Sequence, residues 1–355
     1  ISFLILIRGF ALAQSGSNAG ILNPNQVYDY EAFIKTVNIT GVKEHIKYLS
    51  DTMYRENRIP PTRATGTRGN ELALQYIHNK FKEYGLKDIT IHKWTEPAVP
   101  LSYGANITVQ GVADSITLYP ILPNLISPST TPPEGITGTL IYASNGYLAD
   151  FDGVKVEGSI VLLNWETENR WLNAVKLGAK AVIFLPPDEP DRSFSPYGNR
   201  WNTKYLVNVP LLFPRFFVNG TRYEGDAKVL LDHVGDVVTV RSTVVWQEVT
   251  GKNIFGLVRG TEQPDIIFGI ASYYDSYSVA PDYAPGAQEA CGVAALLELA
   301  KYFANHPAKA SLIFIAFGGH HQLLAGSRWW MNDYYAPWTD VKVRTRPGPD
   351  PKKED

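Results

Sequence analysis

The stretch that decides the fold runs from Asp265 to Trp330, with the sequence DIIFGIASYYDSYSVAPDYAPGAQEACGVAALLELAKYFANHPAKASLIFIAFGGHHQLLAGSRWW. Two short apolar runs, 266–271 and 312–317, have the pattern of strands that are covered on both faces in a parallel sheet. Between them, residues 292–303 keep apolar side chains at helical spacing. A strand, a helix and a strand of these lengths predict a right-handed βαβ unit.

Polar and aromatic residues follow both predicted strands. In open α/β sheets, ligands bind beyond the carboxyl ends of the parallel strands, so these residues are candidates for a site. Gln288 and Glu289 precede the predicted helix and face the same edge. The candidates at the two strand ends are Tyr273, Asp275, Ser276, Gly318, Gly319, His320 and His321.

Several short motifs give this stretch a family resemblance. The frame PGA, then GVAALLELA, then FIAFGG and GSR resembles the di-zinc aminopeptidase superfamily, which includes glutamate carboxypeptidase and the metal-free relatives transferrin receptor and nicastrin. The resemblance implies an α/β fold: a three-layer αβα peptidase-like domain with a mostly parallel central sheet, interrupted by a β-rich protease-associated domain.

The resemblance also implies which positions carry chemistry. Active members have a zinc-binding His two residues before an orienting Asp; this chain has Tyr273 and keeps Asp275. The bridging Asp corresponds to Glu289, in a motif that is one residue shorter. The family's Glu-Glu pair, a general base and a ligand, is replaced by His320 and His321. Two further ligands lie later in the family's domain than this sequence extends.

These replacements disfavour a two-zinc site. Two zinc ions about 3.5 to 4 Å apart need carboxylates to offset their four positive charges. His320 and His321 are neutral where the family has two negative charges, and the Tyr273 phenol has an ordinary pKa near 10. We therefore expect no working catalytic residue and no cofactor.

Alternatives remain open at the same positions. Imidazole is a good zinc ligand, so Glu289, His320 and His321 are weak candidates for a different metal site, although adjacent side chains of extended backbone point apart. The other interpretation is that the histidines are hydrogen-bonded at a strand end and that Asp275 accepts backbone N–H groups. Six aromatic residues near this edge either fill the volume of absent metals or form a contact surface: Tyr273, Tyr274, Tyr277, Tyr283, Trp329 and Trp330.

Composition limits the class of protein. The chain of 355 residues is long enough for one large or two ordinary domains. Its formal net charge of −2 gives no sign of nucleic-acid or anionic-membrane binding. A single cysteine, Cys291, excludes an internal disulfide in this sequence, and we expect it to be a small buried residue at a helix start.

The first residues indicate a location outside the cytoplasm. The apolar run 1–13 ends in Ala-Leu-Ala, which has the form of a signal-peptidase site, and it is too short to span a bilayer. Three sequons, at Asn38, Asn106 and Asn219, are typical of a secreted or cell-surface glycoprotein. Thr40, in the first sequon, is alternatively a cap for the helix that follows.

The chain divides into five predicted segments. Residues 1–20 are a signal-peptide remnant and flexible terminus, and 341–355 form a tail. Residues 21–101 and 247–340 are the two parts of the peptidase-like domain, the second of them truncated relative to the family. Helices over 42–54 and 71–84, and an edge strand around 89–94, belong to the first part. Residues 102–246 resemble a protease-associated domain, with strands over 138–143, 159–163, 181–185 and 237–240 and a helix over 169–177.

Two functions from different classes follow. The first is a secreted, aminopeptidase-like protein without catalysis, which serves as a binding or assembly component for a protein partner or for itself, with a peptide as a candidate ligand of the vestigial crevice. The second is a zinc-dependent exopeptidase with substituted ligands. The altered charges at Tyr273, His320 and His321 favour the first.

Overall fold

The computed structural model describes residues 4–5, 38–122, 129–186, 211–221 and 223–335. The tail 341–355 and the predicted signal-like run and flexible terminus lie outside these residues, except for the two residues of β1 (Leu4–Ile5), which pair with β9. No helix among the described residues combines the length and the apolar character needed to cross a membrane.

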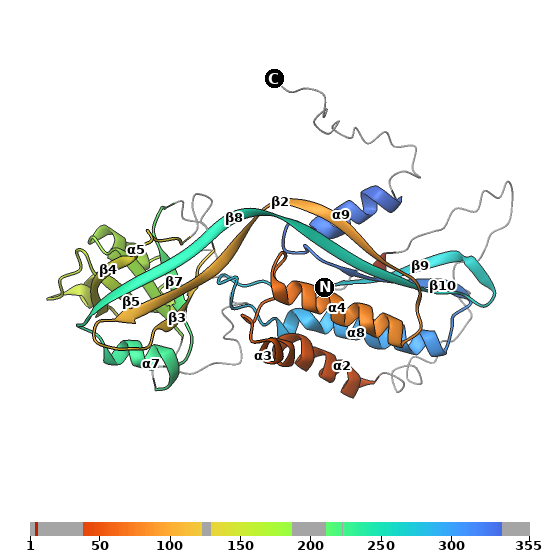
Figure 1. The fold of residues 1–355 in the computed structure, drawn as a ribbon, viewed down its shortest axis with the longest axis horizontal. Helices are drawn as coiled ribbons and strands as arrows, with labels where there is room; N and C mark the ends of the chain where they lie inside the picture. The colour runs from red at the N-terminus through yellow and green to blue at the C-terminus, as the bar shows by residue number, and fades with distance from the viewer. Residues whose placement is uncertain (1–3, 6–37, 123–128, 187–210, 222, 336–355) are drawn as a thin grey trace, which may run out of the picture.

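The predicted βαβ unit is present over residues 263–317 (Figure 1). Strands β9 (Gln263–Tyr273) and β10 (Ala310–Phe317) pair in parallel, and α8 (Ala287–Asn305) connects them. The helix begins before the predicted residue 292. Gly286 explains this, because its left-handed conformation, with φ +65°, turns the preceding loop directly into the helix.

The α/β class is confirmed, and the sheet is mixed. β10 pairs antiparallel with β8 (Val237–Val258), and β8 pairs antiparallel with β2 (Lys87–Val109). One face of this sheet is covered by α8 together with α2 (Ile39–Lys47), the π-helical turn η1 (Tyr48–Thr52), α3 (Met53–Asn57) and α4 (Arg68–Glu83). The other face carries α9 (Ala325–Trp330) and the turn η4 (Met331–Tyr335). Figure 1 shows these layers above and below the strands.

The apolar spacing of the helices explains this arrangement. In α4, Ala73, Ile77 and Phe81 recur every four residues and are fully buried. They meet the buried side of α8 and the strand residues Ile254 and Phe314 in one core. The sequence therefore places one continuous apolar layer between the helices and the sheet.

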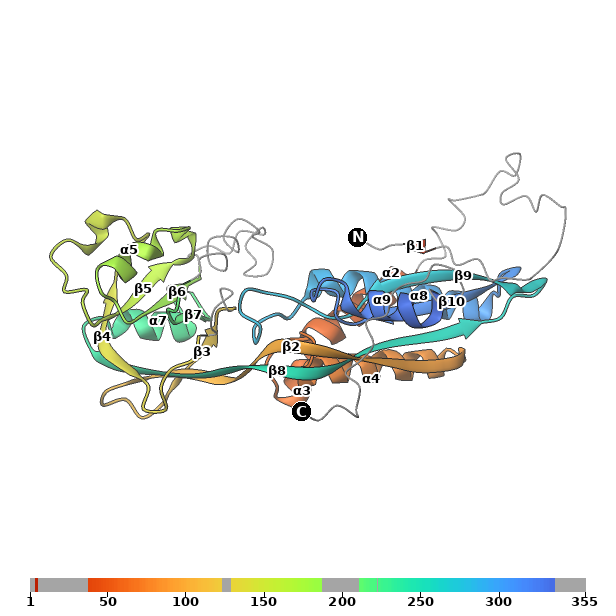
Figure 2. The ribbon, with the colours of Figure 1, turned by 90° about the horizontal axis from the view of Figure 1, so that it is seen from above.

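A second lobe extends from the first along a long two-stranded ribbon made by β2 and β8 (Figure 2). The predicted domain boundaries at 101/102 and 246/247 fall inside these strands, where Leu101 pairs with Val245. The short predicted edge strand is thus the start of a strand of 23 residues. The other elements that the structure describes in this lobe are β3 (Ile116–Pro120), β4 (Ile136–Tyr142), η2 (Leu148–Phe151), β5 (Ile160–Asn164), η3 (Trp165–Thr167), α5 (Trp171–Lys176), β6 (Ala181–Leu185), β7 (Arg215–Val218) and α7 (Gly225–Asp232).

The two lobes share packing as well as strands. The loop after β9 leaves the first lobe and buries Val279 and Ala280 completely in the core of the second lobe. In the same core, the ring of Tyr283 lies 4.7 Å from the ring of Tyr119, measured between centroids. The βαβ unit is therefore anchored in both lobes.

Candidate functional site

The predicted site residues come together at the carboxyl ends of β9 and β10. Tyr273 is the last residue of β9 and pairs with Phe317, the last residue of β10. The two loops that follow therefore start side by side. They bring Asp275 from one strand next to His321 from the other, because the His321 backbone N–H donates to Asp275 Oδ2 at 3.3 Å.

Stacked rings occupy the positions that correspond to the family's first ligand and its Glu-Glu pair. The rings of Tyr273 and His320 are nearly parallel, at 12°, with centroids 3.9 Å apart. His321 stacks on Tyr277 at 5.2 Å and meets the His320 ring edge to face at 5.0 Å. We call Tyr273, Tyr277, His320 and His321 the aromatic cluster.

Burial keeps the imidazoles of the cluster neutral. It lowers the pKa of His321 to about 4, helped by the nearby His320 and Arg63, and it also lowers the pKa of His320. The phenol of Tyr273 also stays uncharged, because burial and then the negative charges of Glu289 and Asp275 raise its pKa. At neutral pH the cluster therefore offers rings and no anion.

Asp275 is completely buried beneath the cluster. Its Oδ1 atom has no hydrogen-bond partner, and burial raises the pKa of the carboxyl group to about 7, although backbone N–H groups and Arg63 act in the opposite direction. The Nε2 atom of His321 is likewise buried without a partner. Asp275 is therefore protonated in a large fraction of molecules near neutral pH.

Arg63 organises the loops around the cluster, and the sequence reasoning did not single it out. Its buried guanidinium donates to the carbonyl oxygens of Leu49, Tyr274, Pro285 and Gly286, at 2.7 to 2.9 Å. The only sequence signal was its place before a glycine in the segment RATG, which precedes α4. Arginine is suited to this position because its planar group presents five donors in a fixed arrangement.

Glu289 lies in the first turn of α8 and is half-buried, and its Oε2 atom approaches Gly286. The expectation that Cys291 is buried was wrong. Its side chain is exposed on the same helix, and Sγ contacts the carbonyl oxygen of Ala287. The reason is that residue 291 lies one position past the buried stripe marked by Ala290 and Val293.

The aromatic residues near the edge do not form one surface. Trp330 is buried on the opposite face of the sheet, against Phe255 and Phe317. Tyr274 is fully buried in the first-lobe core, where its hydroxyl donates to the Lys252 carbonyl, and Tyr283 packs in the second lobe. Trp329 is exposed. Only Tyr273 and Tyr277 of this set join the histidines.

The donor set at the strand ends does not fit a pair of zinc ions. Among the described residues, no three His, Cys, Asp or Glu side chains converge in a metal-binding group. The chemistry of the residues gives the reason: Tyr273 stacks on His320, the neutral ring of His321 stacks on Tyr277, and the fully buried carboxyl group of Asp275 has a pKa of about 7. Glu289 alone cannot balance four positive charges.

The three sequons lie in different settings. Asn38 is exposed and caps α2, since its Oδ1 accepts from the Gly41 backbone N–H, so Asn38 and not Thr40 forms this cap. Asn106 is half-buried within β2. Asn219 is exposed, and its Oδ1 accepts from the Tyr283 hydroxyl at 2.9 Å.

The sequence around the site is similar to a known peptidase family. Residues 253–344, which include α8, β10 and the aromatic cluster, match the model of peptidase family M28. This segment is similar to the M28 peptidases. The predicted resemblance to the di-zinc aminopeptidase superfamily is therefore confirmed.

The chain is also similar to individual curated proteins. A "Probable zinc metalloprotease" of Pyrenophora teres f. teres is 41% identical over 80 residues, which cover 21% of this chain and 17% of that protein. The "Probable lipoprotein aminopeptidase LpqL" of Mycobacterium tuberculosis is 25% identical over 307 residues, which cover 82% of this chain and 55% of that protein.

The fold of this chain is similar to that of a solved zinc aminopeptidase from Bacillus subtilis. The TM-score is 0.50 at 20% identity, and the match covers 83% of this chain and 64% of the other. The chain thus spans less than two thirds of the length of each of these three proteins.

Proposed function

We propose that this M28 segment does not hold the family's zinc pair and that the chain serves as a binding or assembly component without peptidase activity. The observation that carries the proposal is the stack of Tyr273 on His320, at 3.9 Å between ring centroids. It fills the position of the first metal ligand with a ring. The position of the general base is occupied by the neutral imidazole of His320.

Electrostatics supports the same conclusion. Hydrolysis by a two-metal site requires an anionic environment that binds the ions and a base that accepts a proton from water. Burial lowers the pKa of His320, at the position of the general base, which makes it a weaker base, and Asp275 has no exposed surface through which it could reach a substrate. Contact with another molecule requires neither property.

The test is metal content and turnover of the same preparation. We expect purified protein, after incubation with zinc and removal of free metal, to retain far less than one ion per chain and to leave aminoacyl chromogenic substrates intact. An active M28 aminopeptidase treated in parallel is the positive control. Two retained ions per chain, together with turnover that a chelator abolishes, would falsify the proposal.

A second candidate function is that of a zinc-dependent exopeptidase with substituted ligands. The relatives named as zinc metalloprotease and aminopeptidase favour it, as do the retained Asp275 and the nearby Glu289. The substitution Glu289→Gln separates the candidates. If Glu289 is a ligand, the variant loses both bound zinc and turnover, whereas we expect neither to be present in the unaltered chain.

The setting of the protein is part of the proposal. A secreted or cell-surface location rests on the apolar run 1–13 and on the sequons at Asn38, Asn106 and Asn219. The similarity of the second lobe to a protease-associated domain, and with it a role in contacting a protein partner, also stays a prediction. Expression in a secreting host followed by glycosidase treatment would test the location and the three sequons together.

A further inference from the structure

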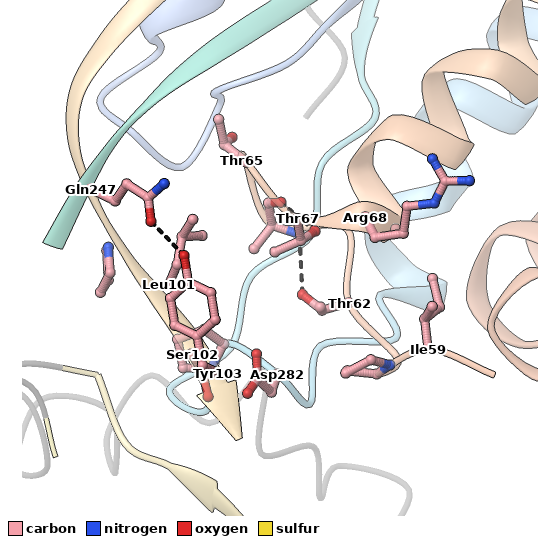
Figure 3. A pocket seen from close by; sticks show the side chains of 16 residues that line it. Ile59, Thr62, Thr65, Thr67, Arg68, Leu101, Ser102, Tyr103, Gln247 and Asp282 are labelled. Atoms are coloured by element: carbon pink, nitrogen blue, oxygen red, sulfur yellow. Dashed lines mark hydrogen bonds between the residues drawn. The ribbon is translucent and has the colours of Figure 1, made fainter. Parts of the chain in front are cut away.

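A cleft with mixed polar and apolar walls lies between the two lobes, apart from the aromatic cluster. It consists of two adjoining cavities of about 420 and 600 Å³, which share Ile59, Pro60, Tyr103 and Asp282 in their walls. The smaller cavity is bounded by the segment that leads into α4 and by the β2–β8 ribbon (Figure 3). Volumes of this size are typical of sites for small molecules.

The wall between the cleft and the aromatic cluster is the segment 62–65. Thr62 and Thr65 line the cleft, whereas the Arg63 guanidinium faces the loops of the cluster. The Thr65 hydroxyl donates to Gln322 at 2.8 Å, which fixes this wall to the loop of the two histidines. The cleft is therefore separate from the aromatic cluster, and the hydrogen bond of Thr65 to Gln322 holds the wall between them in place.

Asp282 is the distinguishing group of the cleft. Of the described residues that line the two cavities, it is the only acid, and Arg68 and Arg241 are the only bases. The Ser102 side chain forms a hydrogen bond with the Asp282 carboxylate, and burial raises the pKa of this group. Within the described part of the chain, no Lys, Arg or His forms an ion pair with it. A half-buried carboxylate without a cationic partner is a costly arrangement, which a bound cation would relieve.

The neighbours of Asp282 indicate which cation fits. Figure 3 shows Asp282 pointing into the space between Tyr103 and Thr62. The Tyr103 ring is positioned at this space by its hydroxyl, which donates to Gln247 Oε1 at 2.6 Å, and an aromatic face attracts a cation. Carboxylate and hydroxyl oxygens accept N–H donors, which favours a primary over a quaternary ammonium group.

We propose that the cleft binds a small molecule with one primary ammonium group, held by the Asp282 carboxylate beside the ring of Tyr103. Arg68 and Arg241, one in each cavity, oppose binding of a polycation by like-charge repulsion. The inference does not depend on the proposed function, because neither the metal content nor the aromatic cluster enters it.

The experiment is a titration of the isotope-labelled full chain, followed through its backbone amide resonances. Propylammonium is the probe, propionate is the size-matched anion, tetramethylammonium is the quaternary cation, and spermidine is the polycation. We expect propylammonium to shift the resonances of Thr62, Tyr103 and Asp282 in a saturable manner. We expect propionate and tetramethylammonium to leave them unchanged and spermidine to bind no more tightly than propylammonium.

Two variants and a control complete the test. Asp282→Asn should weaken binding by about tenfold or more, because a charge-assisted hydrogen bond is lost, and Ser102→Ala should weaken it less. Asp114→Asn, at an exposed carboxylate of the second lobe, should bind as the unaltered chain does. Equal binding by Asp282→Asn, equal binding of propionate, or no saturable shift at about 100 mM propylammonium would overturn the proposal.

Discussion

Asp275 is the residue at which burial and charge conflict most directly. It has no exposed surface and one oxygen without a partner, and its pKa is about 7 in the fold against an ordinary value of 3.8. A carboxyl group whose pKa is raised on folding stabilises the fold in its protonated form. The contribution of Asp275 to the free energy of unfolding is therefore fully present below about pH 4, and it is lost as the pH rises through about 7.

This predicts a pH-dependent effect of Asp275→Asn. The amide stays neutral, so the variant should gain in free energy of unfolding relative to the unaltered chain as the pH rises from 4 to 8, by up to roughly 4 kcal/mol. Denaturant unfolding of both proteins across this range measures the difference. The shifted titration of His321 is present in both and cancels to first order. A difference that does not change with pH would contradict the raised pKa.

Leu323 has a strained backbone conformation. It follows the two histidines with φ +54°, in the left-handed region that costs an L-residue about 1 to 2 kcal/mol, and its side chain is 81% exposed. Leu323→Gly should therefore raise the free energy of unfolding by about 1 kcal/mol, since little packing is lost. Leu148→Gly is the control: Leu148 is 63% exposed with ordinary backbone angles, so this change should destabilise.

The sequence was sufficient to predict which residues meet at the strand ends. Tyr273, Asp275, His320 and His321 follow two neighbouring parallel strands, and such strands end at one edge. The ring stacking was beyond prediction, because it depends on side-chain rotamers. Arg63 was also missed, since four of its acceptors are backbone carbonyl groups, which any residue supplies, and the other is the hydroxyl of Tyr54.

At the scale of elements, α4 connects the site to the cleft. The helix starts at Arg68, two residues after the wall segment 62–65, and Gly69 in its first turn lies against the carbonyl group of Thr62. An added methyl group at this position would overlap that oxygen atom. The close contact explains why a residue with low helix propensity stands in the first turn.

Gly69→Ala is therefore expected to destabilise the chain by about 1 to 3 kcal/mol, although alanine is the better helix former. Thermal unfolding measures the change. Asn79→Ala, on the exposed side of the same helix, is the control and should be neutral or slightly stabilising. If Gly69→Ala were as stable as the control, this would contradict the close contact between Gly69 and the carbonyl oxygen of Thr62.

Element types were easier to predict than element lengths. The period of 3.6 identified α4 and α8 correctly, because each helix buries one regular side. Continuous apolar runs identified β6 and β10, which are buried on both faces. β2 was predicted as a short strand, since its continuation passes Pro97 and Pro100 and changes register twice against β8. Such irregular pairing depends on the partner strand. It produces no regular alternation of apolar and polar residues along the sequence of β2, so the sequence alone does not predict it.

For the whole molecule, the two lobes share more than a connecting strand. Ribbon strands β2 and β8 contribute to both, and the loop that follows β9 inserts Val279 into the second-lobe core near Trp165 and Phe217. An element that carries the candidate site is thus held by the packing of the distant lobe. This arrangement couples the stability of the lobes.

We accordingly expect the chain to unfold in a single transition, with tryptophan fluorescence and backbone circular dichroism giving coincident curves. Val279→Asp places a charge in a fully buried position, so it should destabilise the chain strongly and separate the two curves, because the lobe contact is lost while each lobe keeps its own core. Val234→Asp, at a 44% exposed position, should leave a single transition. Two transitions in the unaltered chain would mean that the ribbon and the inserted loop do not couple the lobes.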